Sequence, residues 1–228
     1  MNSTNHAADE PSELEKAVLD SMFEQDEEYA NALICNLHEL GDSEGHNCLA
    51  CNFADIVERL KGLAQDFSKF SDAVTGKITY LLWLYLLAER MQVILKLISF
   101  PEEIKNQKFP KFLLVKRWAN FFKHPKAFFL THHAQYDQAP QGGNEVVIDD
   151  SFINRYYSGD KKNKELYERL TNKADVLVLL PDLVALTKGI GQELAYLSDV
   201  IRSNPIYGEI LVNKSVLEEY YSGQLTDS

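Results

Sequence analysis

Residues 78–88 read ITYLLWLYLLA, which is the most apolar stretch of the chain. The charged pair Glu89 and Arg90 interrupts it after eleven residues, whereas a membrane span needs roughly 20 apolar residues. A helix that is apolar on most sides is typical of the centre of a bundle. We therefore predict that the run lies in a buried core helix over residues 76–99, which ends before Pro101.

Apolar residues recur at helical spacing on both sides of this run. Ser12 and Glu15 resemble a capping box, and Pro110 suits the first turn of a helix. The helix that follows Pro110 should end near His124, because Pro125 disfavours helical backbone in the residue before it. The helices that this spacing predicts cover residues 12–40, 49–72, 76–99, 110–124, 161–171, 182–203 and 207–221.

Between residues 127 and 180 the pattern of apolar residues changes. Residues 127–134 and 145–148 flank a turn-rich segment, and residues 176–180 read VLVLL before a proline. Short runs rich in branched residues are typical of strands. The sequence thus predicts a mainly α protein, a helical bundle with a small α/β insertion that contains two or three short strands. The expected parts are a disordered N-terminus (1–11), a first bundle portion with a basic helix (12–126), the insertion (127–180) and helices that complete the bundle (181–228).

The composition fits a globular chain in the cytoplasm. Of the 228 residues, 45% are hydrophobic, which is enough for a sizeable core. The N-terminus is polar and acidic and does not resemble a signal peptide. We expect no membrane association.

Charge is distributed unevenly along the chain. The net charge is -11, yet residues 104–136 contain seven basic residues and no acidic residue. Such a strip can attract a polyanion locally although the rest of the protein repels it. Alternatively, it can pair with residues 1–30 of the same or another subunit, which hold nine acids and one lysine.

The centre of the basic strip, residues 116–125, reads KRWANFFKHP. Arg117, Asn120 and His124 recur at three and four residues and should share one face of a helix. A guanidinium can grip phosphate oxygens with two bonds, and an imidazole can move protons near neutral pH. These features favour phosphodiester chemistry, with Asn120 orienting the other two. The side chains expected to hold RNA are Lys116, Lys123 and Lys126, through phosphates, and Trp118, through base stacking.

Arg117 and His124, separated by six residues late in a bundle helix, resemble the signature of the HEPN superfamily. The resemblance implies a helical core that forms a homodimer, in which two motif helices face each other. It also implies a composite endoribonuclease site that uses no metal or other cofactor for catalysis, with Arg117 and His124 catalytic and a 2′,3′-cyclic phosphate product. Such proteins act on RNA (here tRNA or mRNA) in toxin–antitoxin or phage-defence systems, which suggests an antitoxin or defence partner.

The same residues also admit a structural interpretation. Arg117 can pair with a carboxylate, His124 can cap the end of its helix, and the aromatic residues can belong to the core. The protein is then a non-catalytic helical interaction module whose basic strip binds an acidic partner or RNA.

The only three cysteines fall within 17 residues of one another, at positions 35, 48 and 51. Cys35 and His38, followed by Cys48 and Cys51, read C-x2-H-x9-C-x2-C, which offers four ligands for a tetrahedral site. We therefore expect a structural zinc site between the first two helices, with His46 as an alternative fourth ligand. The competing interpretation is three reduced thiols in a cytosolic protein.

Several motifs of other enzyme classes are missing from the sequence. It contains no GxxxxGK loop, no GxGxxG and no GxSxG, and Gly189-Ile-Gly191 lies inside a helical pattern. We interpret the adjacent carboxylates Asp149 and Asp150 as solvated surface.

Overall fold

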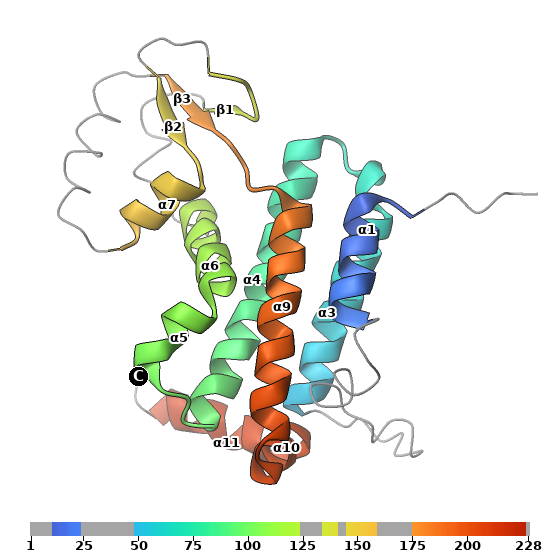
Figure 1. Ribbon diagram of the computed structural model, residues 1–228, viewed down its shortest axis with the longest axis vertical. Helices are drawn as coiled ribbons and strands as arrows, with labels where there is room; N and C mark the ends of the chain where they lie inside the picture. The colour runs from blue at the N-terminus through green and yellow to red at the C-terminus, as the bar shows by residue number, and fades with distance from the viewer. Residues whose placement is uncertain (1–10, 24–47, 124–133, 141–144, 159–174, 227–228) are drawn as a thin grey trace, which may run out of the picture.

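The computed structural model of the chain describes residues 11–23, 48–123, 134–140, 145–158 and 175–226. These residues are mainly helical, and a small sheet stands at one end of the helical bundle (Figure 1). The predicted fold class is therefore confirmed. The bundle comprises α1 (Glu13–Val18) with its π-helical continuation η1 (Leu19–Phe23), α3 (Leu49–Gln65), α4 (Ala73–Leu97), α6 (Pro110–Lys123) and α9 (Leu183–Arg202).

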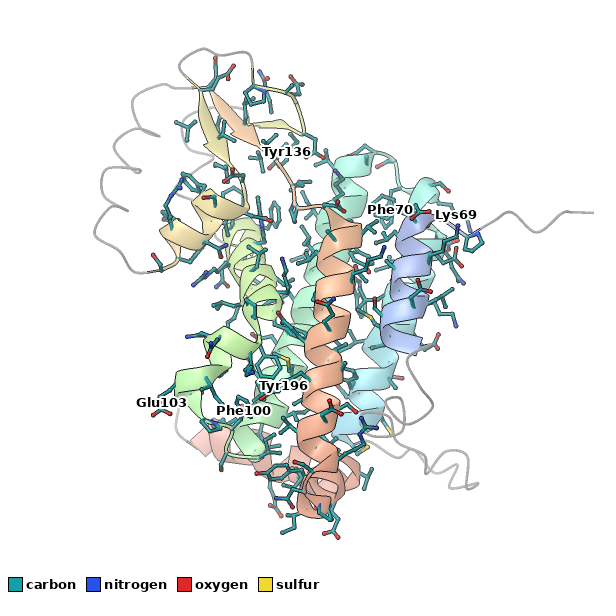
Figure 2. The ribbon with its side chains drawn as sticks, viewed as in Figure 1. Lys69, Phe70, Phe100, Glu103, Tyr136 and Tyr196 are labelled. Atoms are coloured by element: carbon teal, nitrogen blue, oxygen red, sulfur yellow. The ribbon has the colours of Figure 1, made fainter. Side chains whose placement is uncertain are left out.

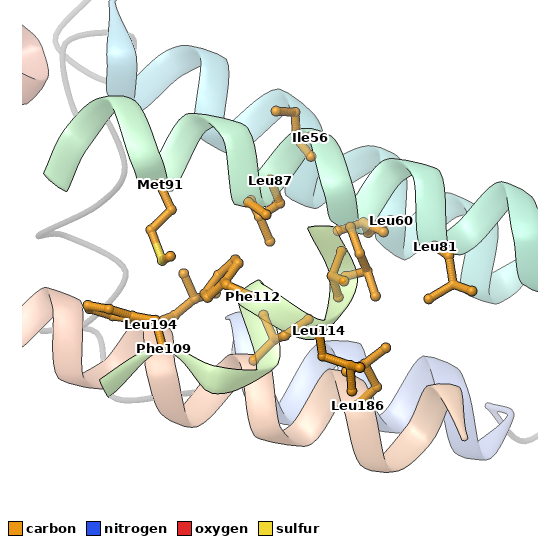
Figure 3. Packing of buried hydrophobic residues seen from close by; sticks show 14 of the residues in the cluster. Ile56, Leu60, Leu81, Leu87, Met91, Phe109, Phe112, Leu114, Leu186 and Leu194 are labelled. Atoms are coloured by element: carbon orange, nitrogen blue, oxygen red, sulfur yellow. The ribbon is translucent and has the colours of Figure 1, made fainter. Parts of the chain in front are cut away.

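Helix α4 is the central helix, as its apolar sequence predicts. It packs against α3 and α6, and Leu81, Leu84 and Leu87 are completely buried. Figure 3 shows residues of α3, α4, α6 and α9 meeting in this core. Among the described residues, α4 is the one helix long and apolar enough to cross a membrane, but half of its most apolar window is buried inside the protein. That burial fits the core helix of a bundle.

Helix α9 closes the bundle and begins where the sequence predicts. The side chain of Asp182 caps it by accepting hydrogen bonds from the backbone N–H groups of Val184 and Ala185, at 2.9 and 3.1 Å. Inside the core, the hydroxyl groups of Tyr80 and Thr187 lie 2.9 Å apart. This bond joins α9 to α4 and satisfies two buried polar groups that would otherwise cost stability.

The C-terminal segment was predicted as one helix over residues 207–221, and this prediction is wrong. The structure has two helices at the end of the bundle opposite the sheet, α10 (Pro205–Val212) and α11 (Lys214–Thr226) (Figure 1). Asn213 between them has an extended backbone, and its side chain accepts a hydrogen bond from the N–H of Ser215. An asparagine in this role ends one helix and starts another.

The predicted helix over residues 49–72 is too long, because α3 ends at Gln65. Phe67 and Phe70 follow in a turn and pack edge to face, with ring centroids 5.7 Å apart. Asp72 then caps α4 through the N–H of Thr75, at 2.8 Å. The predicted helix over residues 12–40 is described only to residue 23, and the one over residues 161–171 lies outside the described residues.

Two short helices were not predicted, α5 (Glu102–Lys108) and α7 (Asp150–Tyr156), each of seven residues. Two turns of helix are too short for an apolar period to stand out in a sequence. Phe109, which follows α5, packs between Phe100 and Tyr196 with ring centroids 5.6 and 5.7 Å away. Figure 2 labels these two partners, Phe100 before α5 and Tyr196 on α9.

The sheet has three parallel strands, β1 (Gln135–Tyr136), β2 (Val146–Ile148) and β3 (Val176–Val178), with β3 in the centre. All three residues of β3 are buried, as expected for a central parallel strand. β2 and β3 lie within the predicted segments. The predicted strand over residues 127–134 falls almost entirely outside the described residues, and β1 begins directly after it.

Asp137 attaches the sheet to the bundle. Its carboxylate accepts a hydrogen bond from the backbone N–H of Leu180 at 3.0 Å and forms an ion pair with Lys77 of α4 at 2.6 Å. Its φ of 53° lies in the left-handed region, which aspartate tolerates better than most residues. The strand ends of the insertion are thereby fixed against the first turns of α4.

Candidate anion site on helix α6

The start of α6 is fixed by a carboxylate from α9. Glu193 accepts hydrogen bonds from the backbone N–H groups of Lys111 and Phe112, at 2.6 and 3.0 Å. These donors have no partner within their own helix, and Glu193 replaces the local side-chain cap. This contact fixes the start of α6 against α9. The position of the basic motif, which α6 carries, therefore depends on it.

Burial raises the pKa of Glu193 to about 7, although its two backbone hydrogen bonds act in the opposite direction. The raised pKa means that the folded protein binds this proton more tightly than the unfolded chain does. The associated stability is fully present below the unfolded pKa, near 4.5, and is lost as the pH rises through about 7.

We therefore expect Glu193→Gln to remove a pH-dependent loss of stability. Between pH 4.5 and 8 the free energy of unfolding of the wild type should fall relative to the variant by up to about 3 kcal/mol. The single carbonyl oxygen of glutamine can accept one of the two N–H groups, and the cost of losing the other hydrogen bond is the same at every pH. Urea denaturation of both proteins at several pH values measures the difference between their free energies of unfolding. The contributions of other titrating groups are the same in both proteins and cancel in this difference. A difference that does not change with pH would contradict the raised pKa.

The inner face of α6 is hydrophobic core, and this corrects one expectation. Trp118 is completely buried, and its indole N–H donates to Asp150 Oδ1 at 2.7 Å. Phe122 stacks on it, with centroids 5.7 Å apart and ring planes at 22°. Trp118 therefore cannot stack an RNA base in this conformation, and its expected role in RNA binding is wrong because the helical period directs it inward.

The outer face of α6 carries the residues that the motif predicts. Arg117 and Asn120 lie one turn apart on this side, and both are half-buried. The guanidinium Nη1 of Arg117 donates to Asn154 Oδ1 of α7 at 2.6 Å. His124, the third member of the motif, lies outside the described residues, as does Lys126.

The charge of Arg117 has no counter-charge in the described part of the chain. Its hydrogen-bond partner, Asn154, is a neutral amide, so the pairing of Arg117 with a carboxylate, which the structural interpretation expects, is not found there. Burial lowers the pKa of the Arg117 guanidinium, but an arginine still remains protonated. A partly desolvated cation without a counter-charge favours the binding of an anion.

The lysines of the basic strip are directed mainly toward other helices. Lys116 Nζ donates to Gln92 at 2.7 Å and lies 3.4 Å from Glu89, both in α4. Lys123 Nζ lies 3.3 Å from the ring centroid of Tyr85. These contacts partly satisfy both cations within the protein. To hold RNA phosphates, as the sequence predicts, Lys116 and Lys123 must turn away from α4.

The alternative that the strip pairs with the acidic N-terminal region finds no support among the described residues. The carboxylates that lie near lysines of the strip in the described residues belong to α4, α5 and α9, namely Glu89 beside Lys116, Glu102 beside Lys105 and Glu193 beside Lys111. Only residues 11–23 of the acidic region are described. None of the ion pairs found in the described residues joins the two segments.

Asp149 and Asp150 have structural roles, which corrects the prediction of solvated surface. Asp149 caps α7 by accepting the N–H of Phe152 at 2.7 Å, and Asp150 accepts the indole N–H of Trp118. Both residues are half-buried. Together they place Asn154 of α7 beside Arg117, a contact for which the sequence gives no signal.

The cysteine cluster is described only in part. Cys48 and Cys51 lie at the start of α3, with their sulfur atoms 3.4 Å apart, whereas Cys35, His38 and His46 fall outside the described residues. In the described residues alone, no three metal-ligating side chains come together. The expected zinc site thus remains a prediction, of which the structure describes one half.

Comparison of the chain with protein-family models, curated proteins and solved structures gives no match.

Proposed function

We propose that the outer face of α6 binds RNA and cleaves it without a metal ion. The observation that carries this proposal is the half-buried guanidinium of Arg117, which is held by a neutral amide and has no counter-charge among the described residues. A phosphodiester supplies a negative charge of the right size, and a guanidinium can bind two of its oxygens. The proposal includes that the protein is a cytoplasmic homodimer and that its substrate is tRNA or mRNA.

In the proposed reaction, His124 moves protons and Arg117 stabilises the phosphate. The ribose 2′-hydroxyl gives up its proton to a base and attacks the phosphorus, the 5′-oxygen leaves and takes a proton, and a 2′,3′-cyclic phosphate remains. Arg117 neutralises the charge that develops on the phosphate oxygens. Asn120 of the same face would orient Arg117 and His124, and a second subunit would supply a second Arg117 and His124. The toxin–antitoxin and phage-defence settings belong to the same proposal.

A second candidate is a non-catalytic interaction module. It is favoured by the contacts of Lys116 and Lys123 with α4, which leave few cations for a long polyanion. A compact anion, such as a carboxylate of an acidic partner or antitoxin, needs only Arg117. In this case His124 has no role in binding.

Cleavage of total RNA and purified tRNA in EDTA tests the proposal. We expect the wild type to cut and to leave cyclic phosphate ends, and Arg117→Ala and His124→Ala each to lower the rate about 100-fold or more. Arg155→Ala is the matched control, because Arg155 is an exposed arginine next to Asn154, and within the described residues its guanidinium bonds to Ser151 of its own helix. It should cut like the wild type.

Three outcomes separate the candidates, provided that circular dichroism shows each protein folded in EDTA. Equal cleavage by all four proteins means that Arg117 and His124 are not the site. Absence of cleavage together with RNA or acidic-peptide binding that needs Arg117 but not His124 identifies the interaction module. If Arg155→Ala loses as much cleavage as Arg117→Ala, the loss reflects the removal of any positive charge near α7 and not a specific site at Arg117.

A further inference from the structure

The start of α3 brings two cysteines into a defined pair. Cys48 is the N-cap residue of this helix of 17 residues, and its sulfur accepts a hydrogen bond from the backbone N–H of Cys51 at 3.3 Å. The two sulfur atoms lie 3.4 Å apart. The side chains therefore point to the same place and are not merely close in sequence.

The position of the pair at the start of a helix favours thiolates. A negative sulfur at the first turn of a helix is stabilised by the helix dipole and by the backbone N–H groups there. The N–H of Cys51 supplies one such bond to Cys48. We propose that Cys48 and Cys51 bind a soft divalent metal ion, Zn²⁺, as a pair of thiolates.

The sulfur separation fits a shared metal ion better than a disulfide. Two thiolates about 2.3 Å from a tetrahedral zinc ion are about 3.8 Å apart, so the observed 3.4 Å requires only a small opening. A disulfide needs about 2.05 Å and therefore a much larger movement. Burial points the same way, because Cys48 is completely buried and Cys51 is 9% exposed, whereas redox-reactive cysteines are accessible.

The position of the pair in the fold suggests what the ion would stabilise. Helix α3 packs on α1, α4 and α10, so an ion at its first turn would fix the end of the helix to whichever segment supplies the other ligands. The described residues offer no third ligand.

Metal titration of the reduced, full-length protein tests the proposal. We expect the wild type to bind a single Zn²⁺ and to give with Co²⁺ the near-ultraviolet charge-transfer band of sulfur ligands. Cys48→Ser and Cys51→Ser should each weaken binding by about 100-fold or more. Asn52→Ala, a half-buried neighbour in the same helical turn, should bind like the wild type.

A measurement on the wild type alone covers the case in which the serine variants do not fold. Zn²⁺ should slow the alkylation of Cys48 and Cys51 at least tenfold, as mapped by peptide mass spectrometry, and a chelator should restore the rate. The proposal is overturned if the protein binds no Zn²⁺, if folded serine variants bind as tightly as the wild type, or if alkylation is unchanged. A Cys48–Cys51 disulfide that persists in reducing buffer overturns it as well. None of these results depends on RNA cleavage.

Discussion

Replacing Trp118 with alanine is expected to lower the free energy of unfolding by about 3–5 kcal/mol. Trp118 is among the largest fully buried side chains, and its ring contacts Phe121 and Phe122 at centroid distances of 5.7 Å each. Truncation leaves a cavity between α6 and α7 that rigid helices cannot fill. It also removes the hydrogen bond to Asp150. Urea denaturation followed by circular dichroism measures the change.

The other tryptophan of the chain provides the control. Trp83 is half-buried on α4, and the guanidinium of Arg59 lies over its ring at 5.6 Å from the centroid. Trp83→Ala should cost about 1–2 kcal/mol, because less apolar area is removed from the core. If Trp83→Ala destabilises the protein more than Trp118→Ala does, the inward placement of Trp118 is wrong.

The hydrogen bond can be separated from the packing by a second substitution. Asp150→Ala leaves the indole N–H of a buried ring without an acceptor, which should cost about 1–3 kcal/mol. Trp118→Phe keeps an aromatic ring and removes the donor. In a protein that carries both substitutions, the loss should be smaller than the sum of the two single losses. Trp118→Phe is also the variant for RNA assays, since it should retain any cleavage if the ring does not touch RNA.

The interior of the bundle could be predicted from the sequence because its helices are long. The apolar periods of α4, α6 and α9 extend over 25, 14 and 20 residues, which is enough to distinguish a helix from a strand. Caps such as Ser12 and Asp182 mark ends through local chemistry and can be recognised in the sequence. The short helices α5 and α7 depend on tertiary packing, so their positions could not be predicted.

The candidate site could be predicted only in part, because one of its contacts depends on tertiary packing. Spacing of three and four residues places Arg117 and Asn120 on one face of α6, and the structure has both on its outer side. The same period directs Trp118 inward, which periodicity alone should have indicated. Asn154 is 37 residues away from Arg117 and meets it only because α7 packs on α6. No pattern in the local sequence predicts that contact.

Replacing Gly191 with alanine is expected to destabilise the protein by about 2–3 kcal/mol, although alanine is the better helix former. A Cβ at this position of α9 would lie 2.4 Å from Ser21 Cβ and 2.9 Å from the Ser21 carbonyl oxygen. Ser21 belongs to the π-helical turn η1, which packs directly on α9. Backbone is among the atoms in the way, so the clash can be relieved only if η1 moves away from α9. Thermal and urea denaturation measure the loss.

Two other helical glycines make the prediction specific. A Cβ on Gly62 of α3 meets nothing within 4 Å, so Gly62→Ala should stabilise the protein by up to about 1 kcal/mol through helix propensity alone. At Gly189 the nearest atom would be Lys111 Cγ at 2.9 Å, and this flexible side chain can move aside. Gly189→Ala should therefore be close to neutral. Equal effects at all three positions would mean that α9 and η1 are not in close contact.

Partial rescue identifies the contact itself. Ser21→Gly removes the Cβ that lies nearest to the new methyl group but leaves the Ser21 carbonyl oxygen in place. In the Gly191→Ala background it should therefore recover part of the lost stability and not all of it. In the wild-type background the same change should only destabilise, because glycine weakens a helical turn. This reversal of sign is expected only if the two residues touch, and it would show that the close approach of the first helical segment to α9 depends on a glycine at position 191.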